Sequence, residues 1–167
     1  VVERLADRVP VSIDTYKAEV AREAVRRGAV MINDISGLLY DPRLADVAAA
    51  TGAALVLMHT RGHSHDMYEH ANYADVLGEV RDELQGAMGR AIAAGVRRDA
   101  IVVDPGFGFA KKATHSVELL ARLRDAYDLP YDRHCMHEFV LSARNLKREH
   151  GITALDVAKR LMDYGIH

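Results

Sequence analysis

The stretch IVVDPGFGFAKK, residues 101–112, joins a short apolar run to a loop rich in glycine and phenylalanine. The run ends on Asp104, and Pro105 stops the strand because proline has no backbone N–H to donate to a sheet. Gly106 and Gly108 then allow the backbone to adopt turns that other residues resist. The stretch predicts a buried strand that carries a carboxylate at its carboxyl end, followed by a loop able to approach a ligand closely.

Three further segments of the chain have the same organisation of an apolar strand followed by a helix. The predicted strands, each with the start of its loop, occupy 9–15, 29–37, 53–62 and 101–112, and the predicted helices occupy 16–28, 41–52, 73–95 and 115–127. Strands that are almost wholly apolar and alternate with helices predict an α/β fold with a parallel sheet. The spacing fits a (β/α) barrel and a doubly wound sheet equally well.

A polar residue stands at the carboxyl end of each predicted strand: Asp14, Asn33, His59 and Asp104. A single residue of this kind is more often a helix cap or turn former. Four in succession favour a site, because ligands of parallel α/β folds bind at this edge of the sheet. Two carboxylates and an amide would suit a planar heterocycle that presents ring N–H and amino donors.

The bulk composition excludes several classes of protein. With 49% hydrophobic and 28% charged residues, the 167-residue chain is too apolar for wholesale disorder. The net charge of −2, with both signs interspersed, predicts neither a nucleic acid nor a membrane partner. A single cysteine, Cys135, excludes an internal disulfide framework and leads us to expect a cytoplasmic protein.

Three segments together resemble dihydropteroate synthase, the folate-pathway enzyme of the pterin-binding (β/α)8 barrel class. They are VPVSIDTYKAEVAREAVRRGAVMINDISGL, LVLMHTRG and VVDPGFGFAKKATHSVELLARL, within residues 1–123. The resemblance implies a partial TIM barrel of about four strand–helix units, corresponding to barrel strands three to six. The family is a transferase that joins para-aminobenzoate to dihydropterin pyrophosphate and releases pyrophosphate with the help of Mg2+.

The resemblance also implies roles for individual residues. Asp14, Asn33 and Asp104 match the pterin-binding positions of the family, with Asp104 accepting hydrogen bonds from the pterin amino group and ring nitrogen. Met58 and Phe109 would supply apolar contact to the ring and loop. A plain core role for Met58 is an equal alternative, because methionine readily fills gaps in cores. No residue is assigned a catalytic or metal-binding role.

Three elements of the family pattern are absent. The sequence has no match to the NVTPDSF-like loop that helps to hold Mg2+ and pyrophosphate, to the ESTRPG-like loop, or to the Arg-x-His pair that binds the pyrophosphate anion. Such electrostatic stabilisation of a leaving group is typically the largest catalytic contribution. We therefore expect pterin binding with impaired condensation.

The tail of the chain resembles a different family. Residues 125–167, with HEFVLSA and DVAKRLMDYGIH, resemble the C-terminal part of the glycine dehydrogenase (decarboxylating) P-protein. That family's Schiff-base lysine lies upstream of this part, so pyridoxal phosphate is not expected, and Lys147 and Lys159 are interpreted as solvated. The predicted domains are a partial pterin-binding barrel, 1–123, and a small tail, 124–167. A natural fusion, a designed chimera and a misassembled reading frame would each produce such a join.

The tail also permits a less favoured hypothesis. Residues 138–141 could form a strand that adds to the fourth strand of the sheet, with 153–165 as its covering helix. Lys147 would then bring a cation near Asp104, as the seventh barrel strand does in the resembled family.

Two groups of histidines invite a metal interpretation. His59, His63, His65 and His70 surround Asp66, and the His-x-His spacing suits chelation, although Zn2+ needs further ligands. A solvated loop is the favoured interpretation. The second group, RHCMH at 133–137, lies in the tail and carries no metal role in the family that it resembles.

Three functional hypotheses therefore remain open. The chain is a dihydropteroate synthase or a fragment of one, a pterin-binding module without transferase activity, or a non-functional chimeric fragment. Four parallel strands leave two sheet edges unpaired, which natural proteins avoid. We therefore expect marginal stability or a homo-oligomer formed through the sheet edges.

Overall fold

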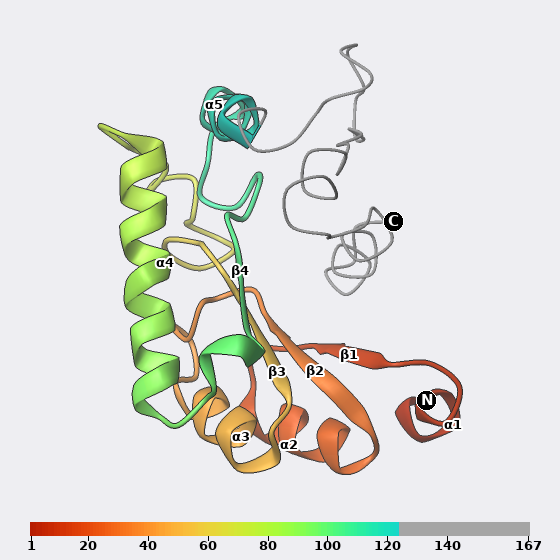
Figure 1. Ribbon diagram of the computed structural model, residues 1–167. Helices are drawn as coiled ribbons and strands as arrows, with labels where there is room; N and C mark the ends of the chain where they lie inside the picture. The colour runs from red at the N-terminus through yellow and green to blue at the C-terminus, as the bar shows by residue number, and fades with distance from the viewer. Residues whose placement is uncertain (124–167) are drawn as a thin grey trace, which may run out of the picture. The chain divides into compact units, whose positions relative to one another are not determined.

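The computed structural model describes residues 1–123, which contain one parallel four-stranded sheet (Figure 1). The strands lie in the order β1-β2-β3-β4, with bounds β1 Val11–Asp14, β2 Ala29–Asp34, β3 Ala54–Met58 and β4 Ile101–Asp104. All three pairings are parallel. The predicted α/β class and all four predicted strands are confirmed.

A helix follows each strand. These helices are α2 Ala18–Arg26, α3 Arg43–Thr51, α4 Val76–Ala93 and α5 Ala113–Leu123; a short α1, Val2–Ala6, precedes β1 and a 3-10 turn, η1 Arg98–Ala100, precedes β4. Neither α1 nor η1 was predicted. The first compact unit of the chain is Val1–His115, and α5 begins within it and continues beyond it.

The core lies between one face of the sheet and the helices α2, α3 and α4 (Figure 1). Ile32, Leu55 and Leu57 supply the strand side of this core, and all three are fully buried. Leu44 from α3 and Ala91 from α4 are equally buried against them. Each large apolar side chain of this kind stabilises the fold by about 1.5–3 kcal/mol. Since side chains alternate along a strand, the neighbouring residues point to the opposite face.

The strand order separates the two architectures that the sequence left open. A doubly wound sheet reverses its strand order at a switch point and carries helices on both faces. Here each strand pairs with the next in the chain without reversal, and α2, α3 and α4 share a single core. Both features are typical of a segment of a (β/α) barrel.

One predicted helix start was wrong in detail. The helix predicted over 41–52 begins at Arg43, with Pro42 at its N-cap position. The Asp41 carboxylate accepts hydrogen bonds from the backbone N–H of Arg43, at 3.2 Å, and from that of Ala18, the first residue of α2, at 3.0 Å. It therefore connects the starts of two helices. Gly52 ends α3 in the left-handed conformation, φ 72°.

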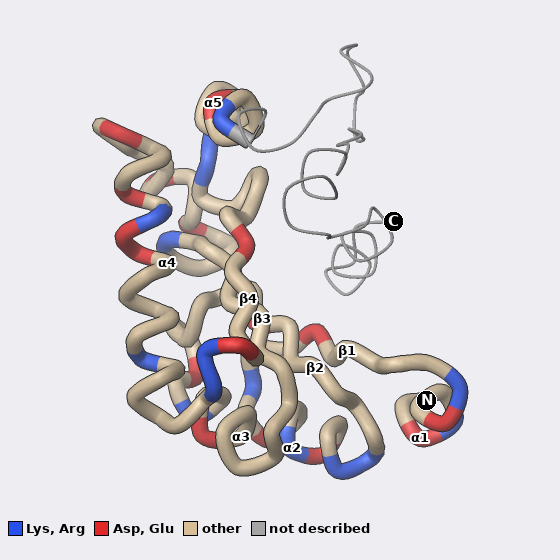
Figure 2. Tube along the Cα trace, in the orientation of Figure 1, with Lys and Arg blue, Asp and Glu red and all other residues tan. Residues whose placement is uncertain are grey.

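Charged residues of both signs are scattered along the described elements (Figure 2). Exposed ion pairs such as Arg26 with Glu23 account for several of them. Among the helices in residues 1–123, none is long and apolar enough to cross a membrane. The predicted tail strand 138–141, its helix and the second histidine group lie outside the described residues, and the boundary between 123 and 124 stays a prediction.

Candidate functional site

Four of the five predicted ligand-binding residues share one face of the sheet. Asp14 lies opposite Asn33 in the pairing of β1 with β2, and Asn33 lies opposite Val56 on β3. Met58 follows Val56 by two residues and therefore points to the same face, where it lies opposite Asp104 on β4. This face is the one that the helix-covered core does not use, so these polar groups gather at the carboxyl edge of the sheet.

Asp104 is a half-buried carboxylate with a fixed orientation. Its Oδ1 accepts a hydrogen bond of 2.7 Å from the backbone N–H of Gly106, and its carbonyl oxygen accepts one of 2.8 Å from the N–H of His59. Burial raises the pKa of Asp104, while the Gly106 N–H and the Lys111 ammonium act in the opposite direction. The group is suited to accept hydrogen bonds from paired donors on a ligand.

The loop after β4 depends on a glycine for steric reasons. Gly106 has φ 65°, and a β-carbon at this position would lie 2.1 Å from the carbonyl oxygen of His59. The same β-carbon would lie 3.2 Å from Cγ of Met58, so Met58 packs directly beneath the loop. Met58 is only 5% exposed. It therefore supports the loop from the face on which Asp104 lies.

Phe109, the fifth predicted residue, lies half-buried in this loop. Its N–H donates to the carbonyl oxygen of Gly106 at 3.1 Å. The next residue, Ala110, is buried with φ 48°, a left-handed conformation that is uncommon for residues other than glycine. The hydroxyl of Tyr73 donates to the Ala110 carbonyl oxygen at 2.9 Å. The loop is therefore held in a costly conformation by contacts outside itself.

Lys111 is the most informative residue that sequence reasoning missed. Its side chain is 2% exposed, which is rare for lysine. Nζ lies 2.8 Å from Nδ1 of His59 and donates to the carbonyl oxygen of Phe109 at 3.0 Å. Burial lowers the pKa of Lys111 to about 8, with Asp104 and Glu83 acting in the opposite direction. Its place directly after the glycine-rich loop was the only available signal.

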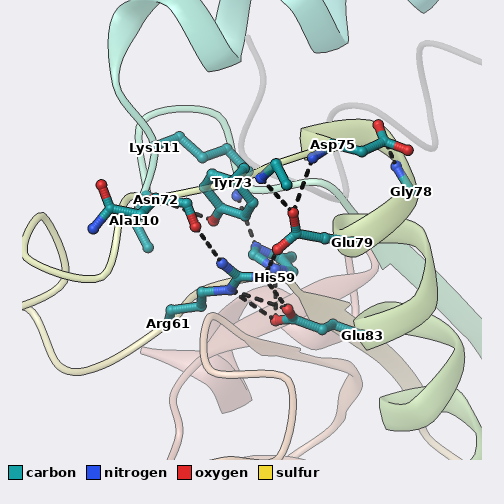
Figure 3. A network of polar contacts seen from close by, with 11 residues as sticks. His59, Arg61, Asn72, Tyr73, Asp75, Gly78, Glu79, Glu83, Ala110 and Lys111 are labelled. Carbon is teal, nitrogen blue, oxygen red and sulfur yellow. Dashed lines mark hydrogen bonds and ion pairs between the residues drawn. The ribbon is translucent and has the colours of Figure 1, made fainter.

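His59 connects Lys111 to α4 (Figure 3). Nε2 of His59 lies 3.0 Å from Oε2 of Glu83, while Nδ1 faces Lys111. An ammonium group can only donate, so Nδ1 accepts and Nε2 carries the proton that is donated to Glu83. Burial, assisted by the charge of Lys111, lowers the pKa of His59 to about 4. The imidazole is therefore neutral at pH 7 and has one fixed tautomer.

Arg61 completes the network from the loop after β3 (Figure 3). Its guanidinium pairs with both Glu83 and Glu79, the latter at 2.8 Å. It also lies over the ring of Tyr73, 4.1 Å from the ring centroid, which suits a cation–π contact. Burial acts to raise the pKa of Glu83, but the hydrogen bonds and the charge of Arg61, together with His59, outweigh burial and keep that pKa below its usual value. The sequence offered no signal for Glu83, because in sequence it looks like any solvent-exposed glutamate on a helix.

Asp34 ends β2, one residue beyond the predicted Asn33. It lies on the helix-covered side and is fully buried. Its two oxygens accept hydrogen bonds from the N–H and hydroxyl of Ser36, at 2.8 and 2.6 Å, and from the N–H of Leu38 at 2.6 Å. Burial raises the pKa of Asp34. These contacts identify Asp34 as a loop-forming residue, whereas Asn33 faces the site.

A cavity opens at the same edge, between the loops that follow β1, β2 and β3. This cavity has a volume of about 550 Å3, and its lining includes Tyr16, Lys17, Tyr40 and His63. Tyr40 stacks on His63 with ring centroids 4.4 Å apart and donates from its hydroxyl to the Gly62 carbonyl oxygen. The loop histidines are thus partly ordered by ring contacts.

The structure does not bring the loop histidines into a metal site. His65 and His70 approach Asp66 at 3.6 and 4.0 Å, and His59 is engaged with Lys111 and Glu83. Within residues 1–123, no group of three or more His, Cys, Asp or Glu side chains could hold a metal ion.

The chain matches two protein families. A family model described as pterin binding enzyme matches residues 1–131, and one described as glycine dehydrogenase, C-terminal domain, matches residues 112–167. Both predicted resemblances are confirmed. The two matches overlap over residues 112–131, so they leave the junction undefined within that range.

Individual relatives agree with the first match. The dihydropteroate synthase of Mycobacterium leprae is 47% identical over 124 residues, which are 74% of this chain and 44% of that protein. The Escherichia coli K12 enzyme is 42% identical over 127 residues, 75% of this chain and 45% of that protein. The chain therefore spans less than half the length of these relatives.

Solved structures support the same fold. Dihydropteroate synthase from Stenotrophomonas maltophilia, with imidazole bound in its active site, has a TM-score of 0.69 and 46% identity over 75% of this chain and 48% of that chain. The Thermus thermophilus enzyme in complex with 6HMPPP has a TM-score of 0.68 and 44% identity over 75% of this chain and 49% of that one. The predicted partial barrel is confirmed.

Proposed function

We propose, because this chain belongs to the family of pterin binding enzymes, that the carboxyl edge of its sheet binds the pterin of a dihydropteroate synthase substrate. The observation that carries the proposal is the placement of Asp104. Its carboxylate is held by Gly106 at 2.7 Å, and Asp14 and Asn33 lie on the same face. The 6HMPPP complex of the Thermus relative supports a pterin ligand.

Each residue of the proposed site has a distinct role. Asp104 accepts two hydrogen bonds from the amino group and ring N–H of the pterin, a charge-assisted pair stronger than a neutral one. Asn33 donates and accepts along the same polar edge of the ligand, and Asp14 completes the polar floor. Met58 and Phe109 provide apolar contact, Met58 from beneath the loop and Phe109 from within it. Together these residues orient the ring and exclude water from its polar edge.

The transfer reaction itself is proposed to be weak or absent in this chain. The family reaction condenses dihydropterin pyrophosphate with para-aminobenzoate, and its metal is Mg2+. The residues of 1–123 do not offer such a site, because no group of three or more His, Cys, Asp or Glu side chains converges among them. Pterin binding without efficient turnover is therefore the function that we propose.

The test is calorimetric titration of the full chain with pterin-6-carboxylate. Asp104→Asn keeps the size of the side chain but removes its charge, and it places an amide donor against the donors of the ligand. A charged hydrogen bond contributes about 1.5–3 kcal/mol, so we expect an affinity at least about tenfold weaker. Asp46→Asn, an exposed position on α3, serves as the matched control. Equal affinity of the Asp104 variant and the wild type would refute the site.

A pyrophosphate-release assay with para-aminobenzoate then separates binding from transfer. Binding with little release supports the proposal as stated. Pyrophosphate release at a rate typical of an enzyme, about 1 s⁻¹ or more, would show that the chain is a working synthase. The proposal of impaired transfer would then be wrong.

A further inference from the structure

The charged form of Asp104 needs electrostatic stabilisation beyond that of the proposed ligand contacts. Asp104 is half-buried, and removing a carboxylate from water disfavours its charged form. The Gly106 N–H is one compensating group. The other is the ammonium of Lys111, whose positive charge acts to lower the pKa of Asp104.

The position of this ammonium is set by two separate elements. Phe109 supplies a carbonyl oxygen at 3.0 Å from the loop after β4, and His59 supplies Nδ1 at 2.8 Å from the end of β3. Both groups accept hydrogen bonds from the Lys111 ammonium, and both are electrically neutral. The lysine thus ties the loop that carries Phe109 to the neighbouring strand.

The chain of hydrogen bonds that begins at Lys111 continues through His59 to α4. His59 donates from Nε2 to Glu83, and Glu83 is held in turn by two hydrogen bonds from Nε of Arg61, at 3.0 and 3.2 Å. The hydrogen bond to Glu83 places the proton of the neutral His59 on Nε2. Nδ1 must then accept, so the bond to Glu83 also fixes the position of the Lys111 ammonium. The charged and titratable groups that face Lys111 are therefore Asp104, His59, Glu83 and Arg61.

We infer that Lys111 is a positioning residue of the pterin site, which fixes the loop after β4 and keeps Asp104 ionised for ligand binding. The inference rests on the proposed function. Lys111 acts through Asp104 and the backbone of Phe109 and makes no contact with ligand itself. Its role is electrostatic as well as structural, and this distinction makes it testable.

The first experiment measures pterin-6-carboxylate affinity from pH 5 to pH 9 for the wild type, Lys111→Met, Lys111→Gln and Lys112→Met. Methionine keeps the buried stem, glutamine also keeps an N–H donor for the Phe109 carbonyl, and Lys112 is the exposed neighbour. Without the Lys111 charge, Asp104 takes up a proton at higher pH. Both Lys111 variants should bind up to about tenfold more weakly at the acid end of this range, and the deficit in affinity should narrow toward pH 9.

The difference in affinity between the wild type and the Lys111 variants should narrow toward pH 9 for two reasons. At high pH, Asp104 is ionised in the wild type and in each variant alike. In addition, Lys111 of the wild type loses its own charge above its pKa of about 8. The Lys112 variant should follow the wild type throughout. A purely structural role would weaken binding equally at every pH, and a Lys111→Gln profile identical to that of the wild type would overturn the inference.

The second experiment needs no ligand and therefore separates this inference from the proposed function. The carboxyl carbon of Asp104 and the ring nitrogens of His59 are followed by NMR during a pH titration. In Lys111→Gln, the apparent pKa of both groups should rise by about one unit, because a nearby positive charge has been removed. Unchanged titrations would reject the role of Lys111, whereas shifted titrations in a protein that binds no pterin would reject only the function.

Discussion

The backbone of Gly106 passes so close to His59 that a β-carbon on the glycine would lie 2.1 Å from the histidine carbonyl oxygen. This contact brings the loop after β4 against the end of β3, beside Asp104. Both partners are backbone groups, so side-chain rearrangement cannot relieve the overlap. The glycine is therefore a requirement of the tertiary structure.

We predict that Gly106→Ala lowers the free energy of unfolding by about 2–4 kcal/mol and weakens pterin binding. The reason is the overlap with His59 together with the φ of 65°. Gly108→Ala is the control, since Gly108 has φ 78° but its β-carbon would meet no heavy atom within 4 Å. It should cost about 1 kcal/mol, from the backbone conformation alone. Urea denaturation measures both, and equal losses would contradict the steric argument.

Stability should fall on acidification between pH 6.5 and pH 4 because of His59. Its pKa is about 4 in the folded chain against 6.5 for an ordinary histidine. In that interval the unfolded chain binds a proton that the folded chain does not, so each step toward lower pH favours unfolding. The full effect is about 3–4 kcal/mol, because each pKa unit corresponds to about 1.4 kcal/mol. In His59→Gln this part of the pH dependence should disappear, and an unchanged slope of unfolding free energy against pH would refute the assignment.

Arg61→Lys should destabilise the chain by about 1–3 kcal/mol, although the charge is kept. Lysine cannot pair with Glu79 and Glu83 through a planar fork, nor stack in the same way on Tyr73. Arg81→Lys is the matched control, because its ion pair with Asp82 is exposed on both sides and should contribute less than about 0.5 kcal/mol. Thermal unfolding of both variants tests the difference. Comparable shifts in the two variants would argue against the network.

Self-association through the sheet edges is our last prediction. Among the described strands, β1 and β4 each have a strand neighbour on one side only. Unpaired edges favour pairing with another chain. Sedimentation velocity should therefore show species larger than the 18.5 kDa monomer at increasing concentration. Val103→Lys places a charge on a β4 residue that is 46% exposed and should reduce the association. A monomer at every concentration would contradict the prediction.

The sequence was sufficient to predict the four strands, the helices that follow them and the polar residues at their carboxyl ends. These features are encoded locally, by runs of apolar residues, by helical periodicity and by glycine or proline at the turns. It did not distinguish a barrel from a doubly wound sheet. That choice depends on which strands become neighbours, and the order β1-β2-β3-β4 decided it.

The candidate site divides in the same way. The sequence alone identified Asp14, Asn33 and Asp104, because a polar residue that ends an apolar strand is visible in one dimension. Only the tertiary structure revealed Lys111, since its burial depends on His59, 52 residues earlier in the chain. A lysine next to a loop is ordinarily solvated, and what makes this one different is the low-dielectric enclosure formed when β3, β4 and α4 pack together.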